Sequence, residues 1–405
     1  MKTKLLVLSI FAATAVTVTL FPLIQQASAT IQQSPNIIEP VELHPIVKNE
    51  HPKIEVVFVL DTTGSMSGLI NAAKEKIWSI ASTMASAQNT PDIKMGIVAY
   101  RDRGDTYVTK NIALSTDLDS MYAKLMELQA DGGGDTPESV NQALDDAINK
   151  MSWSDDQQVY KVVFLVGDAP AHMDYQDDVK YPQTIALAKQ RGIIINTIQA
   201  GDAHDTAKVW QHLASLGQGD YFQVEQTGNA IAIATPYDKK MAELSAKLDN
   251  TRLYYGDKDK KAKQQSKVAA TRKLHKEASE ESLARRAEFN SAPSGKTNFL
   301  GDGELVEAIS SGRVDLSSIA KEELPETLQE MDVATQKVLI QQKAKERETL
   351  QDEIKQLAEK RNDYLKTEVA KAGGKKDSLD AKIYGSIRSQ AKEKGLLYDE
   401  DSAKY

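Results

Sequence analysis

The chain lacks cysteine altogether, which excludes disulfide frameworks, thiolate metal sites and cysteine nucleophiles. It also lacks an excess of basic residues, because the net charge over 405 residues is −8. Nucleic acid is therefore not the expected partner, since binding it needs a basic face. What remains is carboxylate, hydroxyl and histidine chemistry, on a chain that is long enough for two or three domains.

Long hydrophobic runs are confined to the N-terminus. Lys2 and Lys4 precede the apolar stretch LLVLSIFAATAVTVTLFPLI, and the ASA at 27–29 fits a small-residue cleavage site. We expect a signal peptide over residues 1–29, cleaved near Ala29, and a secreted or periplasmic location. An uncleaved membrane anchor facing outside the cytoplasm is the alternative, and only then would the protein contact a membrane. Residues 30–53, with four prolines, are expected to form a linker.

Stretches rich in Val, Ile and Leu alternate with helical patterns from residue 54, which is typical of a parallel sheet covered on both faces. The stretch TKNIALS follows the second strand too closely for a helical crossover, so we expect an antiparallel edge strand there. A helical pattern at 228–248 is expected to close the domain. The sequence therefore predicts a doubly wound, mostly parallel α/β domain over residues 54–250. The other expected strands are IEVVFVL, IKMGIVAY, YKVVFLVG, IIINTIQAG and DYFQV, and the expected helices cover 69–87, 121–129, 139–151, 184–190 and 206–216.

The composition changes after residue 250. Residues 251–300 are rich in Lys, Glu, Ala and Gln and are expected to form a charged helical connector. Residues 301–405 are expected to be helical and coiled-coil-like. In this region Leu350, Ile354, Leu357 and Tyr364 recur at heptad-like spacing. The helices would fold back as a hairpin or pair with another copy of the chain, so a homo-oligomer is one expectation.

The loop DTTGSMSG, residues 61–68, follows the first strand and precedes a helix, a position that serves several chemistries. A phosphate-binding loop needs a lysine directly after its closing glycine, but Leu69 follows Gly68. A nucleophile elbow needs a serine midway between two glycines, but Met66 stands between Gly64 and Gly68. The sequence disfavours both.

A metal site agrees better with this loop. Asp61, Thr63 and Ser65 alternate, so one carboxylate and two hydroxyls can point into one crevice, and such hard oxygens suit Mg²⁺. Loops after neighbouring strands would complete the site, and Thr136 and Asp168 stand in two of them. Each residue also has a structural explanation, with Thr136 or Ser65 as a helix cap and Asp168 as an ordinary loop carboxylate.

These five positions together resemble the metal-ion-dependent adhesion site (MIDAS) of von Willebrand factor type A domains. The family pattern D-x-[ST]-x-S matches Asp61, Thr63 and Ser65, and the family's threonine and later aspartate match Thr136 and Asp168. The stretches AYRDRGD and GDAPAH also resemble the adhesion domains of some alpha-type kinases, although nothing resembles the kinase part. The resemblance covers about residues 54–250. Threonine at the second-loop position is often seen in bacterial members, so we expect a bacterial secreted member.

The resemblance implies binding and not catalysis. In the family, hydroxyls bind the ion directly and aspartates often act through water, which leaves a coordination position for a Glu or Asp carboxylate of a partner protein. We therefore expect a non-enzymatic, extracytoplasmic adhesion module that uses Mg²⁺, with Mn²⁺ or Ca²⁺ as alternatives.

Two other functions remain open. A metal-dependent hydrolase would use His172 or Asp174 beside the ion, and it requires a base within about 3 Å of a metal-bound water. A structural envelope protein would use the metal only to stabilise its fold. The acidic stretch DYQDD, residues 174–178, would tune selectivity or hold a second cation.

Overall fold

The computed structural model describes residues 51–134, 136–228, 233–371 and 379–398. The expected signal peptide and nearly all of the expected linker lie outside these residues. Every element below belongs to the compact unit Glu50–Tyr405. Within the described ranges, no helix is both long enough and apolar enough to cross a membrane.

A six-stranded sheet forms the centre of this unit, in the order β3-β2-β1-β4-β5-β6. All neighbouring strands pair in parallel except β2 and β3, which are antiparallel, as TKNIALS predicted. The central strands β1 and β4 are buried almost end to end, which explains their unbroken apolar runs. The predicted doubly wound α/β fold is thus confirmed. The strands are β1 (Lys53–Asp61), β2 (Asp92–Tyr100), β3 (Thr109–Ser115), β4 (Tyr160–Gly167), β5 (Ile193–Ala200) and β6 (Gln218–Val224).

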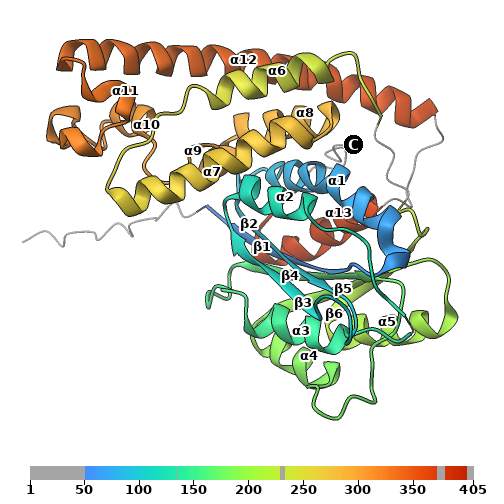
Figure 1. Ribbon diagram of the computed structural model, residues 1–405. Helices are drawn as coiled ribbons and strands as arrows, with labels where there is room; N and C mark the ends of the chain where they lie inside the picture. The colour runs from blue at the N-terminus through green and yellow to red at the C-terminus, as the bar shows by residue number, and fades with distance from the viewer. Residues whose placement is uncertain (1–50, 135, 229–232, 372–378, 399–405) are drawn as a thin grey trace, which may run out of the picture. The chain divides into compact units, whose positions relative to one another are not determined.

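Helices cover both faces of the sheet (Figure 1). Each face has its own apolar core, so the two helix layers pack on opposite sides of the strands. One face carries α1 (Ser67–Ala85), α2 (Leu118–Met126) and α13 (Leu379–Gln390), and the other carries α3 (Val140–Asn149), α4 (Tyr181–Gln190) and α5 (His204–Leu216).

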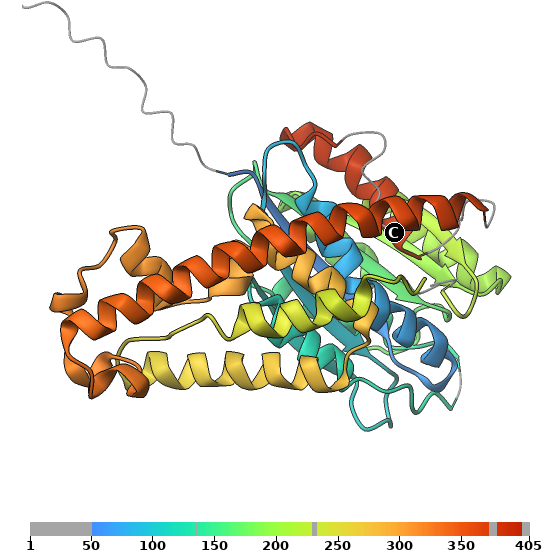
Figure 2. The same cartoon turned by 90° about the horizontal axis from the view of Figure 1, so that it is seen from above.

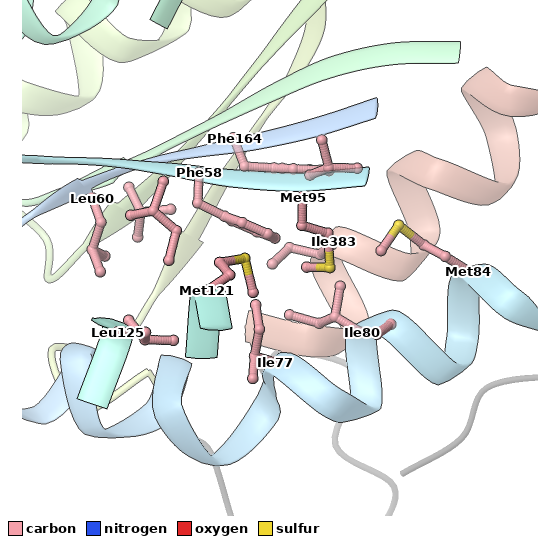
Figure 3. Close-up of a cluster of buried hydrophobic side chains, with 14 of the residues drawn as sticks. Phe58, Leu60, Ile77, Ile80, Met84, Met95, Met121, Leu125, Phe164 and Ile383 are labelled. Carbon is pink, nitrogen blue, oxygen red and sulfur yellow. The ribbon is translucent and has the colours of Figure 1, made fainter. Parts of the chain in front are cut away.

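The core beneath α1 includes a helix from the far end of the chain. Figure 3 shows Phe58 and Phe164 of the sheet facing Ile77 and Ile80 of α1, with Ile383 of α13 in the same cluster. The two phenylalanine rings stack with centroids 5.8 Å apart. Helix α13 therefore completes this face, after an intervening helical region of more than one hundred residues.

The helix α6 (Asp238–Asp249), which the sequence assigned to the sheet domain, shares its apolar cluster with α8 and α12. It lies with the helical region and not on the sheet. The boundaries between the parts of the chain stay a prediction. The remaining helices are α7 (Lys258–Glu277), α8 (Glu280–Ser291), α9 (Lys296–Leu300), α10 (Leu305–Ser310), α11 (Glu326–Gln329) and α12 (Val333–Lys371), with 3₁₀ turns at 64–66, 293–295, 316–318, 321–323 and 391–394.

The segment 251–300, expected as a charged connector, is packed and partly buried. Helix α7 packs on α2, and α8 packs on α1 and α6. Arg286 of α8 is fully buried and donates hydrogen bonds to Asp119 of α2 (2.6 and 2.7 Å) and Asp249 of α6 (2.8 Å). Burial would raise the pKa of Asp119, but Arg286 and Lys267 hold it well below its usual value. This ion cluster joins the helical region to the sheet domain.

The long helix α12 lies across the helical region (Figure 2) and packs on α6, α8 and α10. Its heptad-like residues Leu350 and Ile354 are buried in the cluster with α6 and α8, and Leu357 packs against that cluster. The apolar side of the heptad pattern therefore packs against other helices of the same chain.

Candidate metal centre

Four of the five expected residues follow the carboxyl ends of two adjacent strands, whereas Thr136 lies in the loop between α2 and α3 and not, as the sequence had suggested, directly after a strand. Asp61 ends β1, and Asp168 follows β4, its neighbour in the sheet. The chain leaves β1 toward β2 on one side and later returns to β4 on the other, so the strand order reverses between them. Ligand sites of doubly wound sheets form at this point.

Asp61 is fully buried, and only one of its two carboxylate oxygens accepts hydrogen bonds among the described contacts. Its Oδ1 accepts hydrogen bonds from the Thr63 backbone nitrogen (2.9 Å) and the Thr63 hydroxyl (2.8 Å). Its Oδ2 is buried and has no hydrogen-bond partner among the described atoms. Burial, reinforced by the nearby charge of Asp168, raises the pKa of Asp61 to about 7, although the bonds from Thr63 oppose the shift. A buried carboxylate oxygen without a donor is a position that a cation would satisfy.

Thr63 and Ser65 extend the site toward solvent. The Thr63 hydroxyl is buried beside Asp61 and lies 3.4 Å from the Ser65 hydroxyl, while Ser65 is exposed. Helix α1 begins at Ser67 with Met66 at its N-cap and no side-chain cap bond. Ser65 is therefore not a helix cap, which removes the structural explanation for this serine.

Thr136 is exposed, and no hydrogen bond among the described residues joins it to the other four expected ligands. It is not a helix cap either, because Ser139 is the N-cap residue of α3. Thr136 is therefore an exposed residue of the loop that carries Glu138.

Asp168 is tied to the first loop through a residue that the sequence did not single out. Gln226, just after β6, donates to Asp168 Oδ2 (2.7 Å) and to the Ser65 carbonyl oxygen (3.1 Å). The Thr206 hydroxyl donates to the Asp168 carbonyl oxygen (3.0 Å). The turn after β6 gave no sequence signal, because a lone glutamine in a turn is usually solvated.

Glu138 is the second residue that the sequence analysis missed. It is 3% exposed, and its Oε2 is buried with no hydrogen-bond partner among the described atoms. A Cβ added to Gly133 would lie 2.9 Å from Thr63 Cβ and 3.5 Å from Glu138 Oε1, so Thr63 and Glu138 flank the same glycine. Its place two residues after Thr136 in GGGDTPE was the available signal.

The electrostatics of this group are strongly negative. Burial, reinforced by the charges of Asp61, Asp102, Asp105 and Asp168, raises the pKa of Glu138 to about 9. Burial and the charges of Asp61, Glu138 and Asp168 also hold the pKa of the Tyr100 hydroxyl well above its usual value. No three acidic or histidine side chains among the described residues are arranged to hold a metal by themselves. A cation here would need the hydroxyls of the two threonines and Ser65 as well.

His172 does not face the expected metal position. Its Nδ1 lies 2.7 Å from Asp174 Oδ1 and its Nε2 lies 3.4 Å from Asp102 Oδ2, while its ring stacks on Tyr175 with centroids 4.0 Å apart. Neither nitrogen is paired with Asp61 or Asp168 among the described contacts. The hydrolase alternative required a base aimed at the metal, and the partners of the His172 nitrogens do not supply one.

Comparison with known proteins matches residues 55–235 to a family model described as von Willebrand factor A domain. The von Willebrand factor A domain-containing protein 7 of Rattus norvegicus is 37% identical over 97 residues, which cover 24% of this chain and 10% of that protein. The alpha-protein kinase vwkA of Dictyostelium discoideum is 29% identical over 122 residues, 29% of this chain and 19% of the kinase. This chain thus spans less than a fifth of either relative's length.

Among solved structures, the chain is similar to proximal thread matrix protein 1 of the mussel byssus, in a form described as having a zinc-occupied MIDAS motif. That likeness has a TM-score of 0.34 and 15% identity, and it covers 44% of this chain and 43% of that one.

Proposed function

We propose that residues 55–235, which match the von Willebrand factor A domain, bind a carboxylate of a partner protein through a divalent cation. Asp61, Thr63, Ser65, Thr136 and Asp168 would hold the cation, with Mg²⁺ as the expected ion and Mn²⁺ or Ca²⁺ as alternatives. Glu138 joins the proposed set as a further buried carboxylate. We propose no catalytic role for this site.

The observation that carries this proposal is the unpartnered, buried Oδ2 of Asp61. The Asp61 carboxylate lies near Asp168 and Glu138, and these carboxylates raise one another's pKa because their charges repel. Such an arrangement costs stability unless a cation or proton neutralises it. A bound cation would relieve the repulsion and would satisfy the free oxygen.

The mixture of donors suits binding of a further carboxylate. Hydroxyl ligands are neutral, so an ion held largely by Thr63, Ser65 and Thr136 would retain positive charge toward solvent. The exposure of Ser65 and Thr136 supports an open side of the site that a partner can reach. Within the site, the role of Gln226 is to hold Asp168 in position, and the role of Thr63 is to fix Asp61.

We also propose that the protein acts outside the cytoplasm, as a secreted or periplasmic protein of bacterial type. The basic, apolar and small-residue pattern of residues 1–29 supports this location. Retention of residues 1–29 as an anchor would leave the site on the same side of the membrane. Pairing of two chains through the C-terminal helices is a further proposal, although Leu350 and Ile354 are already buried within one chain.

The test of this function is capture of binding partners from an envelope extract by immobilised protein, in Mg²⁺ and in EDTA. Asp61→Ala should abolish the Mg²⁺-dependent bands. Asp205→Ala, which removes an exposed carboxylate that pairs with Lys208 on α5, is the matched control and should retain them. The same bands in EDTA and with Asp61→Ala would refute a metal-bridged contact.

A metal that only stabilises the fold is the second function that the buried carboxylates support. In that case Mg²⁺ would raise the melting temperature, Asp61→Ala would remove this shift, and partner capture would persist. Measuring melting and capture on the same variants separates the two functions.

A further inference from the structure

Three adjacent strands place Tyr100, Asp61 and Gly167 side by side at the carboxyl edge of the sheet. Asp61 ends β1 and lies opposite Tyr100, the last residue of β2. On its other side β1 pairs with β4 as far as Leu60 and Val166, so Gly167 is the next residue of β4 beside Asp61. The three residues therefore meet where the candidate metal centre begins.

These three residues share one face of the sheet. Side chains alternate along a strand, so a residue points to the same face as the residue two positions before it. In each of the three strands that earlier residue belongs to the apolar core that α3, α4 and α5 cover, and the residues are Val98, Val59 and Leu165. Tyr100 itself belongs to this core. Its ring therefore extends from the apolar core to the edge where Asp61 stands.

The Tyr100 hydroxyl and the Asp61 carboxylate both lie against Gly167. A Cβ added to Gly167 would be 2.5 Å from the Tyr100 hydroxyl oxygen, 3.0 Å from Asp61 Cβ and 3.1 Å from Asp61 Oδ2. A side chain at this position would collide with the hydroxyl, so only glycine allows this close approach. The hydroxyl and Oδ2 therefore border the same small space, which the missing Cβ leaves free.

The Tyr100 hydroxyl is buried and unsatisfied, as is the carboxylate oxygen that borders the same space. Tyr100 is 0% exposed, and neither its hydroxyl nor Asp61 Oδ2 has a hydrogen-bond partner among the described atoms. A buried hydroxyl without a partner costs free energy. Phenylalanine would fill the same apolar surroundings without this cost, so packing alone does not account for the hydroxyl.

The Tyr100 hydroxyl keeps its proton, so it can act as a donor. Burial and the charges of Asp61, Glu138 and Asp168 hold its pKa well above the usual value. A donor that bonds to an ionised carboxylate favours the ionised form. Carboxylate ligands must be ionised to bind a metal. The hydroxyl is therefore suited to stabilise the form of Asp61 that a cation requires.

On the basis of the proposed function, we propose that Tyr100 is a positioning residue of the metal centre, whose hydroxyl donates to Asp61 Oδ2 when the cation is bound. Thr63 already holds the other oxygen, Oδ1, so the carboxylate is then fixed at both oxygens. A carboxylate oxygen accepts more than one bond, so Oδ2 can still face the cation. Tyr100 thus strengthens cation binding without being a ligand, and Gly167 provides the room for its hydroxyl.

Tyr100→Phe removes only the hydroxyl, and two measurements on the full chain test its role. Titration calorimetry should show Mg²⁺ binding that is roughly tenfold weaker than in the unaltered protein, because a hydrogen bond to a charged group is lost. The melting temperature in EDTA should stay the same or rise, because the variant lacks a buried hydroxyl that has no partner in the metal-free protein. Weaker metal binding without a loss of stability is the expected pattern.

Tyr160→Phe is the matched control, because Tyr160 is also buried but its hydroxyl has a partner. Tyr160 begins β4, at the opposite end of the strand from Asp168, and its hydroxyl donates to Gln390 Oε1 (2.9 Å). Its removal should lower the melting temperature in EDTA and leave Mg²⁺ binding unchanged. The two tyrosine variants should therefore show opposite patterns.

Gly167→Ala tests the placement of the Tyr100 hydroxyl without any metal. The added Cβ would meet this hydroxyl, so in EDTA the change should lower the melting temperature more in the unaltered protein than in Tyr100→Phe. Gly385→Ala is the control, since an added Cβ at this position of α13 has no atom within 4 Å. Its effect on the melting temperature should be the same in both backgrounds.

The outcomes separate this inference from the proposed function. Equal Mg²⁺ binding by the unaltered protein and Tyr100→Phe overturns the positioning role alone and leaves the metal centre intact. A Tyr100→Phe variant that also melts lower in EDTA overturns it too, because the hydroxyl then supports the fold. Equal effects of Gly167→Ala in both backgrounds overturn the placement of the hydroxyl. If the unaltered protein binds no Mg²⁺, the proposed function and this inference are both wrong.

Discussion

Gln226 joins two loops that are far apart in sequence: its amide nitrogen donates to Asp168 Oδ2 at 2.7 Å and also to the Ser65 carbonyl at 3.1 Å. One side chain thus sets the position of one expected ligand relative to another. Neither bond belongs to the sheet, so we expect this glutamine to position Asp168 in the candidate metal centre.

Replacing Gln226 by alanine should weaken Mg²⁺ binding about fivefold, because Asp168 loses a hydrogen bond worth about 1 kcal/mol. Titration calorimetry of the two proteins measures this difference. Gln223→Ala is the control, since the Gln223 amide donates to the Gly201 carbonyl (2.8 Å) and, among the described hydrogen bonds, to none of the expected ligands. Equal affinities for all three proteins would show that Gln226 does not position a ligand.

The metal-free protein should lose stability as the pH rises. The pKa of Asp61 is raised from 3.8 to about 7 and that of Glu138 from 4.5 to about 9. A carboxyl group whose pKa is higher in the folded state than in the unfolded state contributes its full stabilisation at pH values below the unfolded-state pKa. This contribution is lost as the pH rises through the folded-state pKa. Urea unfolding in EDTA should therefore give a free energy of unfolding lower by at least about 2 kcal/mol at about pH 8 than at about pH 5.

Mg²⁺ should remove most of this pH dependence, because a bound cation neutralises the carboxylates near neutral pH. Asp61→Asn in EDTA should show a shallower dependence than the unaltered protein. A free energy of unfolding that is constant from about pH 5 to about pH 8 without metal would contradict the electrostatic account.

Arg286→Met should destabilise the whole unit by about 3–5 kcal/mol, since it leaves Asp119 and Asp249 buried without their shared guanidinium. Urea unfolding measures the loss. Lys208→Ala removes an exposed pair with Asp205 (3.3 Å) and should change stability by less than about 1 kcal/mol. A small effect of Arg286→Met would mean that the ion cluster does not hold the helical region on the sheet domain.

Sequence patterns predicted the sheet well because each strand has a local signature. The continuous apolar runs of β1 and β4 follow from burial on both faces, and TKNIALS stands too close to β2 for any connection except an antiparallel turn. The same patterns could not assign α6 and α13. Both helices are amphipathic, and nothing local tells a helix which of two apolar surfaces it will cover.

The candidate site likewise contains residues that the sequence could predict and residues that it could not. Asp61, Thr63 and Ser65 come together because they are neighbours in one loop, and strand order brings Asp168 near them. Gln226 and Glu138 were missed because their roles depend on burial and on contacts between loops. His172 looked like a base in sequence, but its ring nitrogens face Asp102 and Asp174, which only the folded chain reveals.

The most direct test of the central claim is a crystal structure of the protein grown with Mn²⁺, using the anomalous signal of the ion to locate it. We predict one strong peak within about 2.0–2.3 Å of the Thr63 or Ser65 hydroxyl, on the side of Asp61 that faces Asp168 and Glu138. Asp61→Ala crystals should lack this peak. No peak in the unaltered protein, or a peak only at Asp177 and Asp178, would contradict the metal centre.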